Sequence, residues 1–281
     1  MVIDGFESGF ADVNGIRLHY VAGGAGEPLV LLPGWPRTWY QFREVLPLLA
    51  RRYRVIAVDL RGMGESDKPS GGYDKKTMAR DVFELVRSLG YDEVFVAGED
   101  IGSMVAYSFA ANHPEATRKV ALWEVGHPAE AFYDLRMLPQ DGRPDAPWWF
   151  AFNQLDGLPE RLLEGRFRVL VDWLIEYQAT APEAIGEEAR AHYAAAYDTP
   201  EAIRASNGWY QAFGQDIADA RGYPVLEMPV LGLGGIYYPF VPALLEGKAA
   251  DVRFVEFAGA GHYLAEERPG DLVRELVAFF G

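Results

Sequence analysis

Short apolar runs alternate along the chain with longer amphipathic segments. Short apolar runs are typical of buried strands, and amphipathic segments are typical of helices that cover one face of a sheet. The alternation predicts an α/β fold, with a mostly parallel eight-stranded sheet flanked by helices. The expected strands are residues 9–13, 17–21, 29–32, 54–58, 94–97, 119–123, 230–233 and 252–256.

The helices expected between and after these strands are residues 39–50, 76–89, 101–112 and 270–280. The first two strands are separated by Asn14-Gly15, a dipeptide typical of hairpin turns. We therefore expect the sheet to begin antiparallel.

The alternation stops between about residues 128 and 224 and resumes afterwards. Helical stretches are expected there at residues 158–177, 185–197 and 200–213. A helical insertion after the sixth strand would lie over the crevice at the strand ends, where ligands bind in such folds. We therefore expect a core domain of residues 1–127 and 225–281 and a helical cap domain of residues 128–224.

Composition narrows the classes of partner. The chain has 281 residues, a net charge of −15 and no cysteine. Nucleic acid and anionic membrane both need a concentrated positive face, so neither is expected as a partner. The five scattered histidines give no metal-ligand spacing, and we expect no metal or other cofactor. No signal peptide or membrane span is evident, which predicts a soluble cytoplasmic protein and leaves the oligomeric state open, a homodimer included.

The fifth expected strand runs into a Gly-x-Asp-x-Gly sequence centred on Asp100, and a helix-forming sequence follows. This is the pattern of a nucleophile elbow, with aspartate where a serine hydrolase carries serine. Gly98 and Gly102 would let the chain turn and project the apical side chain into a cleft. An ionised carboxylate needs no base to attack an alkyl carbon. An ordinary turn with an exposed acid remains the alternative for the pentapeptide alone.

Three further motifs accompany the elbow: Pro33-Gly34-Trp35-Pro36, Asp59-Leu60-Arg61-Gly62-Met63-Gly64-Glu65-Ser66, and Gly261-His262 before the last helix. Together they resemble the α/β-hydrolase superfamily, and within it the branch of epoxide hydrolases and dehalogenases, from about Gly15 to the C-terminus. The resemblance implies that the aspartate forms an ester with substrate, which a histidine-activated water then hydrolyses.

The resemblance also implies roles for other residues. The family places its catalytic histidine in the loop that here carries His262. Its acid partner follows one of two strands; the later loop has no carboxylate, so Glu124 is the candidate, unless it faces water. The family's oxyanion hole uses two backbone N–H groups, which correspond here to those of Trp35 and Ile101.

Cap tyrosines protonate the leaving oxygen in epoxide hydrolases, and the matching position is Tyr210. A second donor lies early in the cap, which nominates Trp149 or Trp148. Several relatives have histidine in place of Trp149, and an indole can donate a hydrogen bond but cannot release its proton. Aromatic residues that merely line the cap are the alternative.

Two departures from the family pattern are notable. Pro33 and Glu99 stand where relatives often carry histidine. A carboxylate next to Asp100 would raise the pKa of the nucleophile, unless Glu99 turns away or pairs with a cation such as Arg37.

The sequence thus predicts an epoxide hydrolase that acts on a small, hydrophobic, uncharged and aromatic epoxide. The paired tryptophans and the tyrosine are similar to those of epoxide hydrolases that tailor fluorene-type aromatic polyketides. A haloalkane or haloacid dehalogenase with the same triad is one alternative. It fits less well because Ile101 replaces the halide-binding tryptophan, and no arginine follows Asp100 to grip a carboxylate. A non-catalytic binding protein on this fold is the other.

Overall fold

The computed structural model describes residues 3–138 and 147–281. Its eight-stranded sheet has the order β1-β2-β4-β3-β5-β6-β7-β8. β2 pairs antiparallel with both β1 and β4, and the other neighbours are parallel. The strands are β1 Phe6–Val13, β2 Ile16–Gly23, β3 Glu27–Leu32, β4 Tyr53–Val58, β5 Val94–Glu99, β6 Thr117–Trp123, β7 Val230–Gly234 and β8 Val252–Glu256. Each of the eight expected strands is present, and the predicted α/β-hydrolase fold is confirmed.

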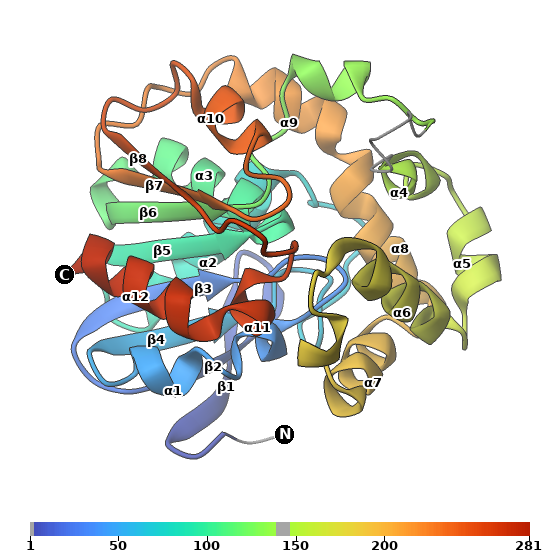
Figure 1. Ribbon diagram of the computed structural model, residues 1–281, viewed down its shortest axis with the longest axis horizontal. Coiled ribbons are helices and arrows are strands. Elements are labelled where there is room, and N and C mark those ends of the chain that lie inside the picture. The colour runs from blue at the N-terminus through green and yellow to red at the C-terminus, as the bar shows by residue number, and fades with distance from the viewer. Residues whose placement is uncertain (1–2, 139–146) are drawn as a thin grey trace.

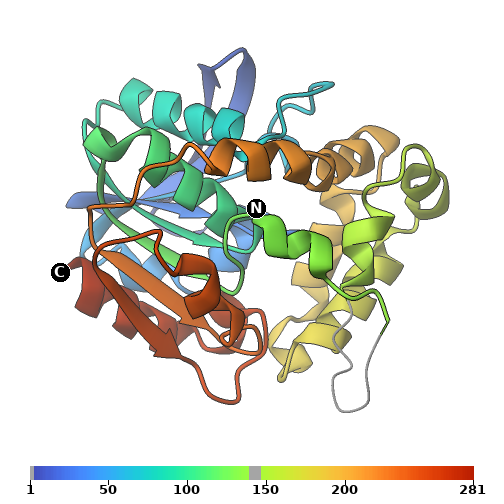
Figure 2. The ribbon, with the colours of Figure 1, turned by 90° about the horizontal axis from the view of Figure 1, so that it is seen from above.

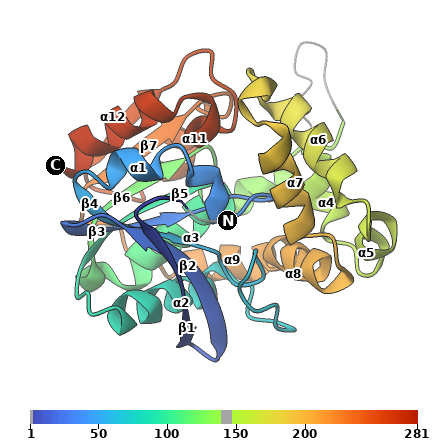
Figure 3. The same cartoon turned by 90° about the horizontal axis from the view of Figure 1, so that it is seen from below.

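Helices cover both faces of the sheet (Figure 3). α1 (Leu46–Leu49) and α12 (Pro269–Phe280) lie on one face, and α2 (Lys75–Ser88) and α3 (Ile101–Asn112) lie on the other. Two short helices, α10 (Phe240–Leu245) and α11 (Leu264–Glu267), follow β7 and β8.

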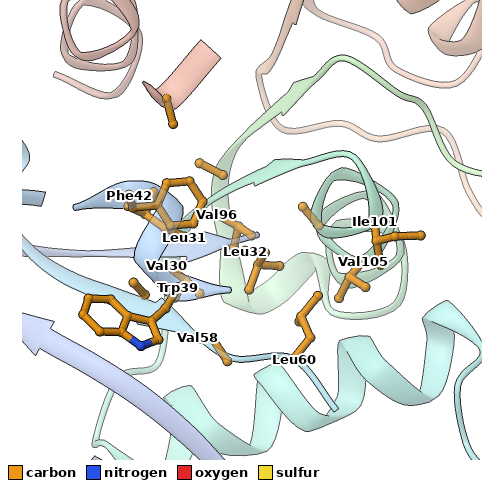
Figure 4. Packing of buried hydrophobic residues seen from close by; sticks show 14 of the residues in the cluster. Val30, Leu31, Leu32, Trp39, Phe42, Val58, Leu60, Val96, Ile101 and Val105 are labelled. Carbon is orange, nitrogen blue, oxygen red and sulfur yellow. The ribbon is translucent and has the colours of Figure 1, made fainter. Parts of the chain in front are cut away.

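The core lies between the sheet and these helices. Leu31, Leu32 and Val96 of the central strands belong to one buried cluster with Ile101 and Val105 of α3 (Figure 4). All five side chains are completely buried. Because the central parallel strands are covered on both faces, most of their residues are apolar, which is why they stand out as apolar runs in the sequence.

The described part of the connection from β6 to β7 is largely helical, and we term residues 128–138 and 147–224 the helical insertion. It lies beside the carboxyl ends of the parallel strands (Figures 1 and 2). Its helices are α4 Trp148–Phe152, α5 Leu158–Leu163, α6 Phe167–Gln178, α7 Glu187–Ala196, α8 Pro200–Gln211 and α9 Phe213–Ala220, with the 3-10 turns η3 Glu130–Asp134 and η4 Pro182–Ala184.

Two expected helices are interrupted. The segment 39–50 forms the 3-10 turn η1 (Trp39–Phe42) and then α1, because Pro47 lacks the N–H that a continuous helix would need and so stands in the first turn of α1. The segment 158–177 divides into α5 and α6 around Gly165, whose positive φ of 67° ends the helical path.

Buried polar contacts join the helical insertion to the core. Lys75 of α2 is fully buried and donates from Nζ to Asp216 Oδ2 at 2.8 Å and to the Trp209 carbonyl at 2.7 Å. Tyr193 of α7 donates to Glu266 of α11 at 2.8 Å. These contacts attach three helices of the insertion, α7, α8 and α9, to the core, in addition to its two chain connections.

No helix within residues 3–138 and 147–281 is long and apolar enough to cross a membrane. The same described residues contain no group of three histidine or carboxylate side chains placed to hold a metal ion.

Candidate active site

Asp100 stands between the last residue of β5 and the first residue of α3, with φ 54° and ψ −120°. This backbone conformation is rare for a residue with a side chain, and the close packing around it explains how it is held. A Cβ on Gly98 would lie 2.2 Å from the Gly102 carbonyl oxygen, and one on Gly102 would lie 2.1 Å from that of Leu32. Both glycines are therefore required by close backbone approach, and the turn is a sharp elbow.

The structure brings the three predicted triad residues together. His262 Nε2 lies 3.8 Å from Asp100 Oδ2, and His262 Nδ1 lies 3.3 Å from Glu124 Oε2. The other oxygen of Glu124 accepts a hydrogen bond from the backbone N–H of Gly235. Glu124 follows β6 and His262 follows β8, so three separate strand ends supply the cluster.

Burial sets the protonation of this cluster. It lowers the pKa of His262 well below its ordinary value, and the charge of Arg37 lowers it further. Burial also raises the pKa of Glu124, against the effect of the Gly235 N–H group. The His262 imidazole is thus neutral at pH 7, which is the form that can accept a proton.

Two backbone donors face the Asp100 carboxylate. The Trp35 N–H group donates to Asp100 Oδ1 at 3.1 Å. The Trp35 and Ile101 N–H groups both lower the pKa of Asp100, while burial raises it more strongly. These are the two groups expected to form an oxyanion hole, and both lie at the carboxylate.

A cavity of about 500 Å³ opens onto Asp100, Glu124 and His262. Most of its remaining wall is apolar, with polar side chains at a few points. Its other lining residues are Val125, Ala131, Phe132, Asp134, Leu135, Arg136, Leu138, Pro147, Trp149, Phe150, Gln178, Tyr237, Phe240, Ala243 and Leu244. Several come from the helical insertion, so the sheet edge and the insertion enclose the cavity together.

The three predicted donors for a leaving oxygen lie in different surroundings. Trp149 lines the cavity. Tyr210 is fully buried; its ring contacts Trp35 with centroids 5.4 Å apart and Phe150 of the cavity wall at 5.5 Å. Burial and the nearby charge of Asp100 raise the pKa of Tyr210, which keeps the phenol protonated.

Trp148 packs among other aromatic rings of the helical insertion. Its ring contacts Trp173 at 5.3 Å and Phe152 at 5.7 Å. Trp149 is among the described residues that line the cavity, whereas Trp148 and Tyr210 are not. Tyr210 nevertheless lies close enough to Asp100 for that charge to raise its pKa.

Glu99 does pair with Arg37, the cation considered for it. Arg37 Nη2 donates to Glu99 Oε1 at 2.8 Å, and both side chains are buried. Burial raises the pKa of Glu99 to about 7, although Arg37 acts in the opposite direction. Glu99 is therefore turned away from the cavity and held inside the core.

Gln178 and Tyr237 are among the polar residues of the cavity wall that sequence reasoning missed. Gln178 Nε2 donates to the Tyr237 hydroxyl at 3.0 Å, and its backbone carbonyl accepts the His262 N–H at 2.9 Å. Gln178 ends an amphipathic helix and Tyr237 lies in an aromatic loop. Neither position carries a recognisable motif.

Comparison with known proteins shows which proteins this chain is similar to. The model of the family described as alpha/beta hydrolase fold matches residues 27–164. The chain is 35% identical to the soluble epoxide hydrolase of Corynebacterium sp. (strain C12), over 96% of each chain. It is 28% identical to the fluoroacetate dehalogenase of a Burkholderia sp., over 99% of this chain and 95% of that protein. The crystal structure of wild-type Cfl2 from Burkholderia cenocepacia superimposes with a TM-score of 0.89 at 35% identity, covering 99% of this chain and 96% of that one.

The chain therefore belongs to the α/β-hydrolase superfamily. It is a hydrolase enzyme with homologues among the epoxide hydrolases.

Proposed function

We propose that this enzyme is an epoxide hydrolase that converts an uncharged aromatic epoxide to a diol through an ester on Asp100. The observation that carries the proposal is the placement of an aspartate, with neutral His262 3.8 Å away, at the base of a largely apolar cavity. Similarity to epoxide hydrolases over nearly the whole chain supports the same reaction.

In the first half-reaction, an oxygen of Asp100 attacks a ring carbon from the side opposite the epoxide oxygen. The carbon–oxygen bond breaks and its electron pair goes to the oxygen, which takes a proton from the Tyr210 phenol. Trp149 donates a hydrogen bond to that oxygen from the cavity wall. The product is a hydroxyalkyl ester of Asp100.

In the second half-reaction, water attacks the carbonyl carbon of the ester and gives a proton to His262 Nε2. Glu124 holds the imidazole by Nδ1 and stabilises its positive charge. The Trp35 and Ile101 N–H groups stabilise the oxyanion. When the tetrahedral intermediate collapses, the diol oxygen takes the proton from His262, and the proton left on the Asp100 carboxyl restores the Tyr210 phenol.

The wall of the cavity favours a flat, apolar substrate. Aromatic residues including Phe132, Trp149 and Phe150 line it, and its volume of about 500 Å³ suits a molecule with several fused rings. Within this class we propose a fluorene-type aromatic polyketide epoxide, on the basis of the Trp148, Trp149 and Tyr210 pattern. The helical insertion then serves as the cap that closes over this substrate.

Dehalogenation is the second candidate, since the relative that is 28% identical to this chain is the fluoroacetate dehalogenase of a Burkholderia sp.. A small haloacid carries a carboxylate that needs cationic partners. Asp100 is followed by Ile101, Gly102 and Ser103, which offer none. Arg136 is the one cation among the described lining residues, and Asp134 lines the same cavity.

The two candidates are separated by their products. We would incubate the protein with aryl epoxides and, separately, with haloalkanes and fluoroacetate, measuring diol by chromatography and halide by ion-selective electrode. Diol from the epoxide without halide from the other compounds is expected. Halide release faster than diol formation would replace the proposal with dehalogenation.

A further inference from the structure

Three buried polar side chains lie behind the nucleophile, and we term Arg37, Gln41 and Glu99 the Glu99 cluster. Each is no more than 1% exposed. Gln41 Nε2 donates to Glu99 Oε2 at 2.7 Å, and Arg37 Nη2 donates to Glu99 Oε1 at 2.8 Å. Burying such groups is costly unless they are paired, so a cluster at this place needs a reason beyond packing.

The Glu99 cluster holds both polar groups of Gly34. The Gly34 N–H donates to Gln41 Oε1 at 2.9 Å, and the Gly34 carbonyl accepts the backbone N–H of Arg37 at 3.0 Å. Gly34 is also tightly enclosed, because a Cβ there would lie 2.7 Å from Cβ of Asp100. The peptide of Gly34 is thus fixed relative to the nucleophile by hydrogen bonds and by close contact.

Trp35 follows Gly34, and its N–H is the donor that reaches Asp100 Oδ1 at 3.1 Å. The Gly34 carbonyl and the Trp35 N–H belong to the same planar peptide group. A shift or rotation of Gly34 would therefore move this N–H group. Oxyanion donors are effective only when they are held at the place where charge develops.

We propose that Gln41 is a positioning residue for the oxyanion donor of Trp35, and that Glu99 and Arg37 hold Gln41 in place. This inference rests on the proposed function and goes beyond it, because it assigns a role to a carboxylate that adjoins the nucleophile without facing the cavity. Glu99 acts through Gln41 and Gly34 on the geometry of Trp35.

The two half-reactions depend differently on this geometry. During ester hydrolysis a full negative charge develops on the carbonyl oxygen beside the Trp35 N–H. During ring opening the Asp100 carboxylate loses its charge, so a displaced donor does not slow the attack. A loosened Glu99 cluster should therefore slow ester hydrolysis selectively, and the ester should accumulate.

The test is rapid-quench mass spectrometry of the whole protein with an aryl epoxide, which gives both the rate of ester formation and the rate of its loss. Gln41→Leu removes the acceptor of the Gly34 N–H. We expect the hydrolysis rate to fall by about 10- to 100-fold, less than the 10²–10³ typical of deleting a donor outright. The rate of ester formation should change less than threefold.

Two further variants make the result specific. The exchange Gln41→Glu with Glu99→Gln keeps the net charge and reverses the hydrogen bond between the two side chains. The Gly34 N–H and Arg37 keep their acceptors, so the exchange should recover at least half of the lost rate on a logarithmic scale. Thr38→Val removes a buried hydroxyl from the same turn, which hydrogen-bonds the Tyr40 N–H at 3.2 Å and His192 at 3.1 Å. This variant should leave the ratio of the rates of ester formation and ester hydrolysis unchanged.

Equal slowing of both half-reactions by Gln41→Leu, or the same accumulation of ester in Thr38→Val, would overturn the positioning role while the ester mechanism stands. Failure of the exchanged pair to recover hydrolysis would overturn it as well. Absence of any ester in these variants and in His262→Gln would instead contradict the proposed function itself, and the inference with it.

Discussion

The carboxyl-terminal edge of the sheet, which carries Asp100, and the helical insertion beside it are held by different kinds of contact. At the sheet edge, the main chain itself sets the geometry: Gly98 and Gly102 pack against backbone atoms, and N–H groups face the carboxylate. In the helical insertion, rings pack on rings and polar contacts such as Lys75 with Asp216 attach the helices to the core.

The rigid contacts at the carboxyl-terminal edge of the sheet suit catalysis, and the side-chain contacts of the insertion suit substrate recognition. A nucleophile and its oxyanion donors must be placed to within a fraction of an ångström, which backbone packing can ensure. A substrate wall can be rebuilt by exchanging side chains without disturbing that placement.

The largest effect is expected at the attachment of the insertion. Lys75→Met leaves the carboxylate of Asp216 buried without its cation, which should lower the free energy of unfolding by about 3–5 kcal/mol. Urea denaturation measures this. Adding Asp216→Asn should recover much of the loss, and Lys76→Met, at an exposed neighbour, should stay within about 0.5 kcal/mol. A Lys75→Met protein as stable as the parent would show that the attachment lies elsewhere.

The second-largest effect is expected when the Tyr210 hydroxyl of the insertion is removed. Tyr210→Phe removes the proposed proton donor and keeps the ring contacts with Trp35 and Phe150, so ester formation should slow by about 10²-fold. Rapid-quench mass spectrometry measures the rate. Tyr237→Phe is the matched control, since it loses a hydroxyl of the cavity wall, and should slow ester formation less than about fivefold. The reverse ranking would assign the donor role to Tyr237.

At the sheet edge, Gly102→Ala should destabilise the fold by about 1–3 kcal/mol, because the added methyl would meet the backbone of Leu32. The fraction of the Gly102→Ala protein that folds should also turn over substrate more slowly, because the elbow that holds Asp100 is displaced. Gly270→Ala, an exposed position in the first turn of α12 with open space around it, should be neutral or raise stability by up to about 1 kcal/mol. Equal effects at the two glycines would remove the argument for backbone packing at the elbow.

The smallest effect is a shift in pH dependence. Because burial lowers the pKa of His262, the imidazole stays neutral at pH values where a free histidine is protonated. The rate of ester hydrolysis, measured from pH 5 to 9, should therefore fall only below pH 6.5 and stay flat above it up to pH 8. A midpoint above pH 6.5 would mean that the positive charge of His262 is stabilised in the ester form.

The division also explains what could be predicted from the sequence. The elbow at Asp100 and the eight strands were visible because backbone packing demands glycine and buried strands demand apolar runs. The pairing of Glu99 with Arg37 was one of three possibilities left open by the sequence, because only the fold brings these positions together. Gln41 and Gln178 carry no motif, because each acts through contacts with residues distant in the chain. Pro47 and Gly165 interrupt two expected helices. Both residues indicate a helix break in the sequence, but the helical periodicity around them favoured a continuous helix.

The central claim is that Asp100 forms an ester with an epoxide, and intact-protein mass spectrometry of His262→Gln tests it most directly. Without the base for ester hydrolysis, incubation with an aryl epoxide should add the mass of the whole epoxide. The gain should disappear when Asp100→Asn is added. A gain that persists in the double variant, or no gain with any epoxide while the parent protein still forms diol, would contradict the account.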